Sequence, residues 1–384
     1  MTNKAISDFK LGVLGGGQLG KMLTLAASQW GLRTAILDAG QDMPAAPVCQ
    51  EFVQGDFRDF ETVYRFGKTV DLLTIEIEQI NIDALEKLEK EGVRVFPSPA
   101  NLRVIQDKAD QTQFLIDQKI PKPAYLTFSS PAEIRKAIDA GKVHFPFVQK
   151  LRKFGYDGRG VRVIRSEKDL SQLLEGETMT EDCVAIDKEL SVIVARNSSG
   201  EVAAYPAVEM VFNPEANLVD YLVCPADITP AIEKEAEVLA KKIAGALNLI
   251  GILAVEMFLD KQGKLWVNEL APRPHNSGHQ TIESSFTSQY EQHLRAILNF
   301  PLGSTATKMP SVMINLLGEP GFSGPAVYEG LKECLAMEGV KIHIYGKKET
   351  RPFRKMGHVT VLDFKRERAL EKAERVRQTI KVKA

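Results

Sequence analysis

Short apolar runs alternate with amphipathic segments through the first hundred residues. The runs have the length of buried strands and cover residues 10–14, 34–37, 72–75 and 93–96. Between them, residues 19–30 and 82–88 carry apolar side chains at the three- and four-residue spacing of a helix. Strands that alternate with helices in this way predict a parallel, doubly wound sheet, the arrangement of an α/β fold.

The pattern changes after prolines 97, 99, 121 and 123, which interrupt the chain. Residues 100–119 have the spacing of one helix, and residues 366–381 have that of a charged amphipathic helix. Further strand-like stretches lie at residues 147–150, 161–164, 190–195, 254–260, 265–270, 341–345 and 358–362. The short glycine-containing links at 155–160 and 261–264 predict hairpins.

The composition is that of an average globular protein: 384 residues, 44% hydrophobic and 26% charged. At roughly 150 residues per domain, this length predicts two to three domains. Because 49 basic and 50 acidic side chains leave a net charge of −1, nucleic-acid binding is disfavoured. Four scattered cysteines without a C-x-x-C pair disfavour a zinc ribbon or a disulfide framework. Asn248 and Glu256 interrupt the most apolar window, so we expect no membrane span. We also expect no signal peptide and a cytoplasmic enzyme.

The first glycine-rich segment, GGGQLG at residues 15–20, follows a predicted strand and opens a predicted helix. Glycine lets a backbone approach an anion, and a helix N-terminus supplies free N–H groups and a positive dipole. Asp38 stands at the end of the second strand, 18 residues after Gly20. The pattern matches the dinucleotide fingerprint, so a nicotinamide or flavin enzyme, a general phosphate site and a tight turn without a ligand all remain open.

A second glycine-rich segment, GYDGRG at residues 155–160, follows a predicted strand that ends in Lys150. Its backbone N–H groups and Arg159 could fold over phosphates, although an ordinary turn is the alternative and the P-loop pattern is absent. Glu181, Asp182 and Glu189 stand around the start of the next buried strand. They are candidates for hydroxyl or amine recognition, or else they mark a solvated strand end.

Two glutamates flank the predicted hairpin at residues 261–264. A two-residue turn at Gln262 and Gly263 places Glu256 directly opposite Glu269 on one face. Two carboxylates at that separation in an apolar hairpin repel each other, and Mg²⁺, which prefers carboxylate and phosphate oxygens, removes the repulsion. The alternatives are an exposed face with both glutamates in water, or an acid/base pair for glycoside hydrolysis, for which no sugar-binding context is present.

A polar loop follows the hairpin, and a basic run lies near the C-terminus. In the loop, Arg273, His275 and Asn276 suit an anionic, hydrogen-bonding substrate, while Pro274 and Gly278 disfavour a zinc-binding helix. Five cations occur between residues 347 and 355. The run is either a solvated face or a clamp for a phosphate group.

Four segments together resemble the ATP-grasp enzymes, and among these the 5-(carboxyamino)imidazole ribonucleotide synthase family of purine biosynthesis. The segments are GGGQLG at 15–20, GYDGRG at 155–160, NELAPRPHNSGH at 268–279 and RPFRKMGH at 351–358. The resemblance runs from Gly12 to about Val361. It implies a mixed α/β and α+β fold with an N-terminal Rossmann-like (pre-ATP-grasp) parallel sheet at 1–107, a small lid domain at 108–185 and a C-terminal ATP-grasp body at 186–384.

The resemblance also implies an ATP site between two β-rich modules. Lys108 and Lys150 contact phosphates, the second glycine-rich loop closes over them, and Glu256 and Glu269 carry Mg²⁺. Residues 181–184 line the adenine, and Glu189 holds the ribose. The implied ATP-binding residues are Lys108, Lys150, Gly155, Tyr156, Asp157, Gly158, Arg159, Gly160, Val161, Glu181, Asp182, Cys183, Val184, Glu189, Asn268 and Glu269.

The implied substrate site uses the first glycine loop, the polar loop and the basic run. Its residues are Gly17, Gln18, Leu19, Glu76, His275, Asn276, Lys347 and Arg354, with Tyr156, Asp157 and Arg273 in catalytic roles. One departure from the family is Phe212, which stands where many relatives have a histidine near the nucleotide.

The activity implied is the ATP- and bicarbonate-dependent carboxylation of the exocyclic amine of 5-aminoimidazole ribonucleotide, through carboxyphosphate, with release of ADP and phosphate. The partners are then small molecules and a second copy of the chain, with neither nucleic acid nor membrane. Alternatives are a formate-dependent transformylase or a biotin carboxylase of the same superfamily, an NAD(P)-dependent oxidoreductase, and a scaffold protein without activity.

Overall fold

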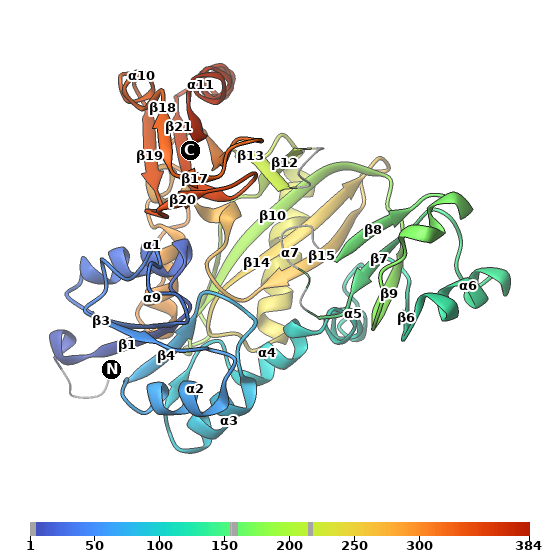
Figure 1. The fold of residues 1–384 in the computed structure, drawn as a ribbon, viewed down its shortest axis with the longest axis horizontal. Helices are drawn as coiled ribbons and strands as arrows, with labels where there is room; N and C mark the ends of the chain where they lie inside the picture. The colour runs from blue at the N-terminus through green and yellow to red at the C-terminus, as the bar shows by residue number, and fades with distance from the viewer. Residues whose placement is uncertain (1–4, 154, 156–159, 214–217) are drawn as a thin grey trace.

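Figure 1 shows the chain as a computed structural model, which describes residues 5–153, 155, 160–213 and 218–384. An N-terminal unit, a small sheet that projects to one side, a long central sheet and a C-terminal extension of that sheet follow one another along the chain. Within the described residues, no helix combines the length and apolarity that crossing a bilayer requires.

The N-terminal unit is the predicted parallel sheet, with strand order β3-β2-β1-β4-β5. Its elements are β1 (Lys10–Leu14), α1 (Gln18–Ser28), β2 (Arg33–Asp38), β3 (Glu51–Gln54), α2 (Phe60–Gly67), β4 (Leu72–Ile75), α3 (Ile82–Lys90) and β5 (Arg94–Val95), after a short 3₁₀ turn at Ile6–Asp8. The strands are almost continuously apolar because both faces of the sheet are covered.

Each face of this sheet packs against a different pair of helices. Leu11, Val13 and Ile36 pack with α1 and with α9 (Gln289–Ile297), a helix that comes from much later in the chain. Leu37 and Ile75 pack on the other face against α2 and α3. Because α9 also packs against the central sheet, it joins the N-terminal unit to the rest of the molecule.

The predicted helix over residues 100–119 is wrong in one respect, because the structure divides it at Asp107 into α4 (Pro99–Gln106) and α5 (Lys108–Asp117). Asp107 has an extended backbone, and its carboxylate accepts hydrogen bonds from the N–H groups of Ala109 and Asp110. Such a cap begins a new helix. The domain limit expected at residue 107 falls at this break. The limit expected at residue 185 falls one residue before strand β10 (Ile186–Arg196).

The projecting unit is a four-stranded antiparallel sheet in the order β6-β9-β7-β8. Its elements are β6 (Tyr125–Phe128), α6 (Pro131–Asp139), β7 (Phe147–Leu151), β8 (Val161–Ile164), a 3₁₀ helix at Glu167–Gln172 and β9 (Thr178–Asp182). A small core centred on Phe147, Ile134 and Ile164 holds α6 against the sheet. In Figure 1 this unit, in green, lies on the far side of the central sheet from the chain termini.

The central and C-terminal strands form one antiparallel sheet, ordered β15-β14-β10-β12-β13-β16-β21-β19, with β11 also paired to β10. Its first part comprises β10 (Ile186–Arg196), β11 (Val202–Ala204), β12 (Val208–Asn213), β13 (Leu218–Cys224), α7 (Pro230–Ala246), β14 (Gly251–Asp260), β15 (Leu265–Ala271), the 3₁₀ turn η3 (Asn276–Gly278), α8 (Thr281–Ser284) and α9. The largest core lies between α7 and strands β10, β14 and β15.

The C-terminal part continues the sheet and is covered by α11, whose Ala369, Ala373 and Val376 pack on β16 and β21. Its elements are β16 (Ser311–Leu317), β17 (Gly324–Pro325), β18 (Val327–Glu329), α10 (Leu331–Leu335), β19 (Val340–Ile344), β20 (Glu349–Thr350), β21 (Lys355–Leu362), α11 (Arg366–Thr379) and β22 (Lys381–Lys383). The two predicted strands at 341–345 and 358–362 are therefore β19 and β21, which pair with each other.

The hairpin between β14 and β15 has a different turn from the one predicted. Asp260 and Lys264 close a three-residue loop, in which Gly263 has a φ of +82°. This shifts the pairing by one residue, but a bulge at Asn268 shifts it back, so Glu256 still pairs with Glu269. The predicted opposition of the two glutamates is confirmed, for a reason that the sequence pattern did not contain.

We expect Asp107→Ala to lower the free energy of unfolding by about 3 kcal/mol, because it removes the cap of α5 and leaves the Arg152 guanidinium without a buried partner. Asp107 is only 2% exposed, and its Oδ2 lies 2.8 Å from Nη2 of Arg152. Urea-induced unfolding measures the loss. Asp110→Ala is the control, since Asp110 is exposed and should change stability by no more than about 0.5 kcal/mol; equal losses in both variants would contradict the assignment.

Candidate active site

The Glu256 and Glu269 pair is the centre of the candidate site, and residues from several parts of the chain surround it. Lys108, the first residue of α5, donates to Oε1 of Glu269. Asn268, the bulge residue, lies with its amide nitrogen 3.4 Å from Oε2 of Glu256. Because the bulge adds one residue on β15, Asn268 and Glu269 both reach this site, although they are neighbours in a strand.

Lysines from the projecting unit and from the link before it complete the surroundings. Lys150 on β7 donates to Oδ1 of Asn268 at 2.9 Å and lies 2.6 Å from Oε2 of Glu181. Lys122 lies 2.6 Å from Oε1 of Glu181 and donates to the carbonyl of Asn268 at 2.9 Å. The buried Lys122–Glu181–Lys150 triad therefore ties the projecting sheet to the bulge in β15.

The charges of the acidic residues differ because their environments differ. Burial, with smaller contributions from Glu269 and Glu189, raises the pKa of Glu256 to about 7. Burial also raises the pKa of Glu189 to about 7. At Glu269 burial acts in the same direction, but Lys108 and Lys150 outweigh it and hold the pKa below its usual value. A cation between the two glutamates would stabilise the ionised form of Glu256.

Burial also disfavours ionisation of Glu181, but Lys150 and Lys122 dominate and hold its pKa at about 2. Burial lowers the pKa of Lys122 to about 8. The triad is thus a closed ion-pair network, and the Glu181 side chain is engaged in it. The expected position of Glu181 at the adenine stays a prediction. Asp182 and Cys183, which end and follow β9, are exposed, and Val184 is half-buried.

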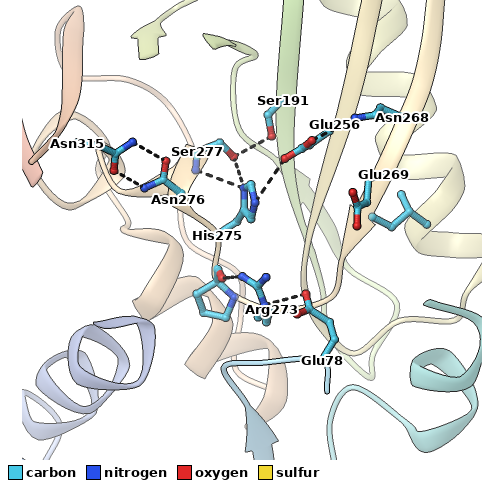
Figure 2. Close-up of polar contacts among 12 residues, drawn as sticks. Glu78, Ser191, Glu256, Asn268, Glu269, Arg273, His275, Asn276, Ser277 and Asn315 are labelled. Carbon is cyan, nitrogen blue, oxygen red and sulfur yellow. Dashed lines mark hydrogen bonds and ion pairs between the residues drawn. The ribbon is translucent and has the colours of Figure 1, made fainter. Parts of the chain in front are cut away.

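Figure 2 shows the polar loop beside the glutamate pair. Nε2 of His275 lies 3.5 Å from Oε1 of Glu256, and Nδ1 faces Ser277. Arg273 forms an ion pair with Glu78, at 2.8 Å, just beyond the end of β4. The side-chain amides of Asn276 and Asn315 bond to each other. The loop therefore connects the N-terminal sheet, the glutamate pair and β16.

Three N–H groups of the first glycine-rich loop donate to carboxylates of the protein itself. The N–H groups of Gly17 and Gly20 donate to the two carboxylate oxygens of Glu76, at 2.6 and 2.7 Å. That of Gly16 donates to Asp38 at 2.7 Å. Burial raises the pKa of Glu76 to about 7. Because Glu76 accepts two of the N–H groups that a dinucleotide pyrophosphate would use, the NAD(P)-dependent alternative is disfavoured.

The other predicted substrate residues lie around this loop and at the C-terminal part. Gln18 begins α1 and is half-buried, whereas the side chain of Leu19 is buried in the core. Lys347 donates to the carbonyl of Lys355 at 2.7 Å, and Arg354 donates to that of Glu349 at 2.6 Å. These two side chains of the basic run therefore bond to the backbone of the run itself.

Some predicted residues lie elsewhere or outside the described ranges. Gly155 is half-buried, and Gly160, with a φ of +79°, precedes Val161 at the start of β8. Tyr156, Asp157, Gly158 and Arg159 lie outside the described residues. Phe212 is partly buried against the apolar cluster around Met210 and Leu222.

Sequence reasoning missed several residues that shape the site. Lys122 lies between Pro121 and Pro123, and the sequence pattern marks this segment only as an interruption of the chain. A lysine between two prolines, just before a strand, is the one local feature that could have indicated a role for it. Glu78 follows Glu76 by two residues, but only the end of β4 brings it to Arg273. Lys21 donates to the carbonyls of Ile344 and Tyr345, which no local pattern reveals.

Comparison with known proteins finds three family models in chain order. They are the ribonucleotide synthetase preATP-grasp domain at residues 9–106, the ATP-grasp domain at 113–290 and the phosphoribosylaminoimidazole carboxylase C-terminal domain at 311–372. The N5-carboxyaminoimidazole ribonucleotide synthase of Bacillus subtilis is 38% identical, over 92% of this chain and 91% of the relative. The chloroplastic phosphoribosylaminoimidazole carboxylase of Vigna aconitifolia is also 38% identical, but the chain spans only 64% of that longer protein.

Two solved structures resemble this chain over nearly its whole length. N5-carboxyaminoimidazole ribonucleotide synthetase from Thermotoga maritima has a TM-score of 0.90 and 47% identity, covering 98% of this chain and 99% of that one. The Aspergillus clavatus synthase, in complex with ADP and 5-aminoimidazole ribonucleotide, has a TM-score of 0.88 and 32% identity, covering 97% and 99%. The fold is therefore the ATP-grasp fold preceded by a preATP-grasp parallel sheet.

We expect Glu256→Gln to stabilise the metal-free protein at pH 8 by about 2 kcal/mol, and to have little effect near pH 5. The folded pKa of Glu256 is about 7, above its value in the unfolded chain, so its contribution to stability is present at low pH and is lost as pH rises through 7. Thermal unfolding with a chelator, between pH 5 and pH 8, measures the difference. The control is the exposed Glu371→Gln; destabilisation by Glu256→Gln at both pH values would contradict the assignment.

Proposed function

This chain belongs to the N5-carboxyaminoimidazole ribonucleotide synthase family of ATP-grasp ligases, and from that premise we propose that it carboxylates 5-aminoimidazole ribonucleotide. The reaction uses ATP and bicarbonate, yields ADP and phosphate, and places the carboxyl group on the exocyclic amine, a step of purine biosynthesis. The observation that carries the proposal is the facing Glu256 and Glu269 pair, bordered by Lys108 and Lys150 and adjoined by Arg273 and His275.

The residues at the glutamate pair fit a magnesium ion. The carboxylates pair across β14 and β15, and burial keeps the pKa of Glu256 near 7, so a hard divalent cation has both a place and an electrostatic reason to bind. Glu256 and Glu269 would hold Mg²⁺, with Asn268 beside them. When bound, the ion supplies charge neutralisation for the phosphoryl oxygens of ATP.

Phosphoryl transfer depends on positioning and charge more than on covalent help from the protein. Bicarbonate oxygen attacks the γ-phosphorus of ATP, the bond to ADP breaks, and carboxyphosphate forms. Lys108 and Lys150 reach this region from α5 and β7, and they place positive charge where the phosphates lie. Glu189, half-buried on β10, is the residue assigned to the ribose, and residues 181–184 are assigned to the adenine.

The second step joins the substrate amine to the carboxyl carbon, and the bond to phosphate breaks. Arg273, paired with Glu78, and His275, which faces Glu256, lie beside the glutamate pair, so they suit the anion that is transferred. Tyr156 and Asp157, in the loop that lies outside the described residues, are assigned to closing the site and to removing the amine proton. Carboxyphosphate hydrolyses readily, so water must be excluded during this step.

The ribonucleotide is assigned to the space between the first glycine loop and the C-terminal part. Glu76, together with the backbone of Gly17, Gln18 and Leu19, supports the ribose end. Asn276, Lys347 and Arg354 support the phosphate end. The complex of the Aspergillus clavatus relative with 5-aminoimidazole ribonucleotide supports this substrate, and the match of the carboxylase C-terminal domain favours it over formate-using or biotin-dependent relatives.

Two further features remain expectations of the resemblance. The chain is expected to form a homodimer, which sedimentation velocity tests. A cytoplasmic location is expected, and it is consistent with Cys49, Cys183, Cys224 and Cys334, all of which are free thiols.

We expect phosphate release to require ATP, bicarbonate and 5-aminoimidazole ribonucleotide together. The reason is that water is excluded from the site, so carboxyphosphate releases its phosphate only when the amine is present to capture the carboxyl group. A coupled assay for ADP and phosphate, with each component omitted in turn, measures this requirement. Two controls are run: formate replaces bicarbonate in one, and biotin replaces the ribonucleotide in the other. Turnover with formate would support a formate-dependent transformylase instead, and turnover with biotin would support a biotin carboxylase.

We expect Glu269→Gln to reduce ATP turnover at least about 100-fold while the protein remains folded, because one of the two carboxylates at the phosphates loses its charge. The steady-state rate of ADP formation measures the loss, and thermal unfolding confirms the fold. Glu371→Gln, on the exposed face of α11, is the matched control and should turn over normally. Near-normal turnover by Glu269→Gln would contradict the metal assignment.

A further inference from the structure

Two hydrogen bonds and one longer polar contact link β10, through the polar loop, to the glutamate pair (Figure 2). Oγ of Ser191 lies 2.8 Å from Oγ of Ser277, and Oγ of Ser277 lies 2.9 Å from Nδ1 of His275. Both serines are 1% exposed. At the other end, Nε2 of His275 lies 3.5 Å from Oε1 of Glu256. Neither serine takes part in the reaction steps proposed for the site.

One bond in this chain fixes the direction of all the others. The backbone N–H of Ser277 donates to Nδ1 of His275 at 3.3 Å, as the first turn of η3 begins. A backbone N–H can only donate, so Nδ1 holds a lone pair and no hydrogen. A neutral imidazole with a bare Nδ1 carries its hydrogen on Nε2.

The hydroxyl groups follow from this assignment. Oγ–H of Ser277 faces the same bare Nδ1 and therefore donates to it, which leaves the Ser277 oxygen to accept from Oγ–H of Ser191. Ser191 is held in a central strand, where it pairs directly with Glu256. The strand paired with the one that carries Glu256 therefore also anchors the ring that faces this glutamate.

We propose that Ser191 and Ser277 are positioning residues for His275: the Ser277 amide fixes the Nε2–H tautomer, and the two hydroxyls hold the ring so that this N–H points at Glu256. His275 then acts in the site as a hydrogen-bond donor rather than as a base. The kinetic consequence rests on the proposed reaction, whereas the tautomer itself does not. Fixing a ring through its second nitrogen is the way in which proteins commonly orient a functional histidine.

The tautomer is tested on the whole protein, without substrates, by ¹⁵N nuclear magnetic resonance after selective labelling of histidine. The His275 signals are assigned by their loss in His275→Gln. We expect Nε2 to give the signal of a protonated nitrogen and Nδ1 that of a bare, hydrogen-bonded nitrogen. A proton on Nδ1 would overturn the proposal, whatever reaction the enzyme performs.

The roles of the hydroxyls are tested by Ser277→Ala and Ser191→Ala. In Ser277→Ala the amide remains, so Nε2 stays protonated, while the Nδ1 signal moves toward that of an imidazole without a hydrogen bond. Loss of one such bond should reduce kcat about fivefold, with KM for ATP unchanged. Ser191→Ala should shift the same signal by less, because Ser277 can still donate.

Two further variants separate positioning from general loss of structure. Ser277→Thr keeps the hydroxyl and should restore both the Nδ1 signal and kcat. Ser284→Ala removes a buried hydroxyl that bonds only to the carbonyl of Gln280, and it should change neither. An unmoved Nδ1 signal in Ser277→Ala would overturn the role of the hydroxyl. Shifted signals in a protein that does not carboxylate the ribonucleotide would leave the tautomer assignment standing and refute the proposed function.

Discussion

Repulsion between Glu256 and Glu269 is the constraint around which the site is arranged. The pairing of β14 with β15 forces the two carboxylates together, and burial makes their charges costly. The protein reduces this cost unevenly, because Lys108 bonds to Glu269 while Glu256 faces the ring of His275. The pair therefore holds one stable negative charge and a second that a cation would favour, which is the electrostatic setting a magnesium nucleotide requires.

The bulge at Asn268 extends the influence of that pair across the molecule. Its side chain accepts from Lys150, and its carbonyl accepts from Lys122. Both lysines meet again at the buried Glu181. A movement of the projecting sheet relative to β15 would break bonds to buried charged groups, so the network sets how the projecting sheet and the central sheet face each other.

The first glycine loop illustrates how an anion-binding geometry can be used internally. The loop and the helix that follows have the form of a dinucleotide site, yet Glu76 and Asp38 accept its N–H groups. The favourable field of the helix N-terminus is then used to hold a carboxylate at the edge of the site rather than a phosphate. This carboxylate lies on the same edge of the parallel sheet as Glu78, which in turn holds Arg273.

The sequence by itself determined the parallel sheet, the helices at residues 19–30, 82–88 and 366–381, and the opposition of Glu256 to Glu269. These depend on local periodicity, glycine and proline positions, and strand pairing across a short loop. It did not determine the break at Asp107, the Lys122–Glu181–Lys150 triad or the partners of the glycine-loop amides. The triad and the loop amides depend on groups that lie far apart in the chain and meet only through tertiary packing, whereas at Asp107 a local cap is joined by an ion pair with the distant Arg152. Even the glutamate pairing needed the tertiary structure for its explanation, because a turn that shifts the register and a bulge that restores it leave the same two residues opposite each other.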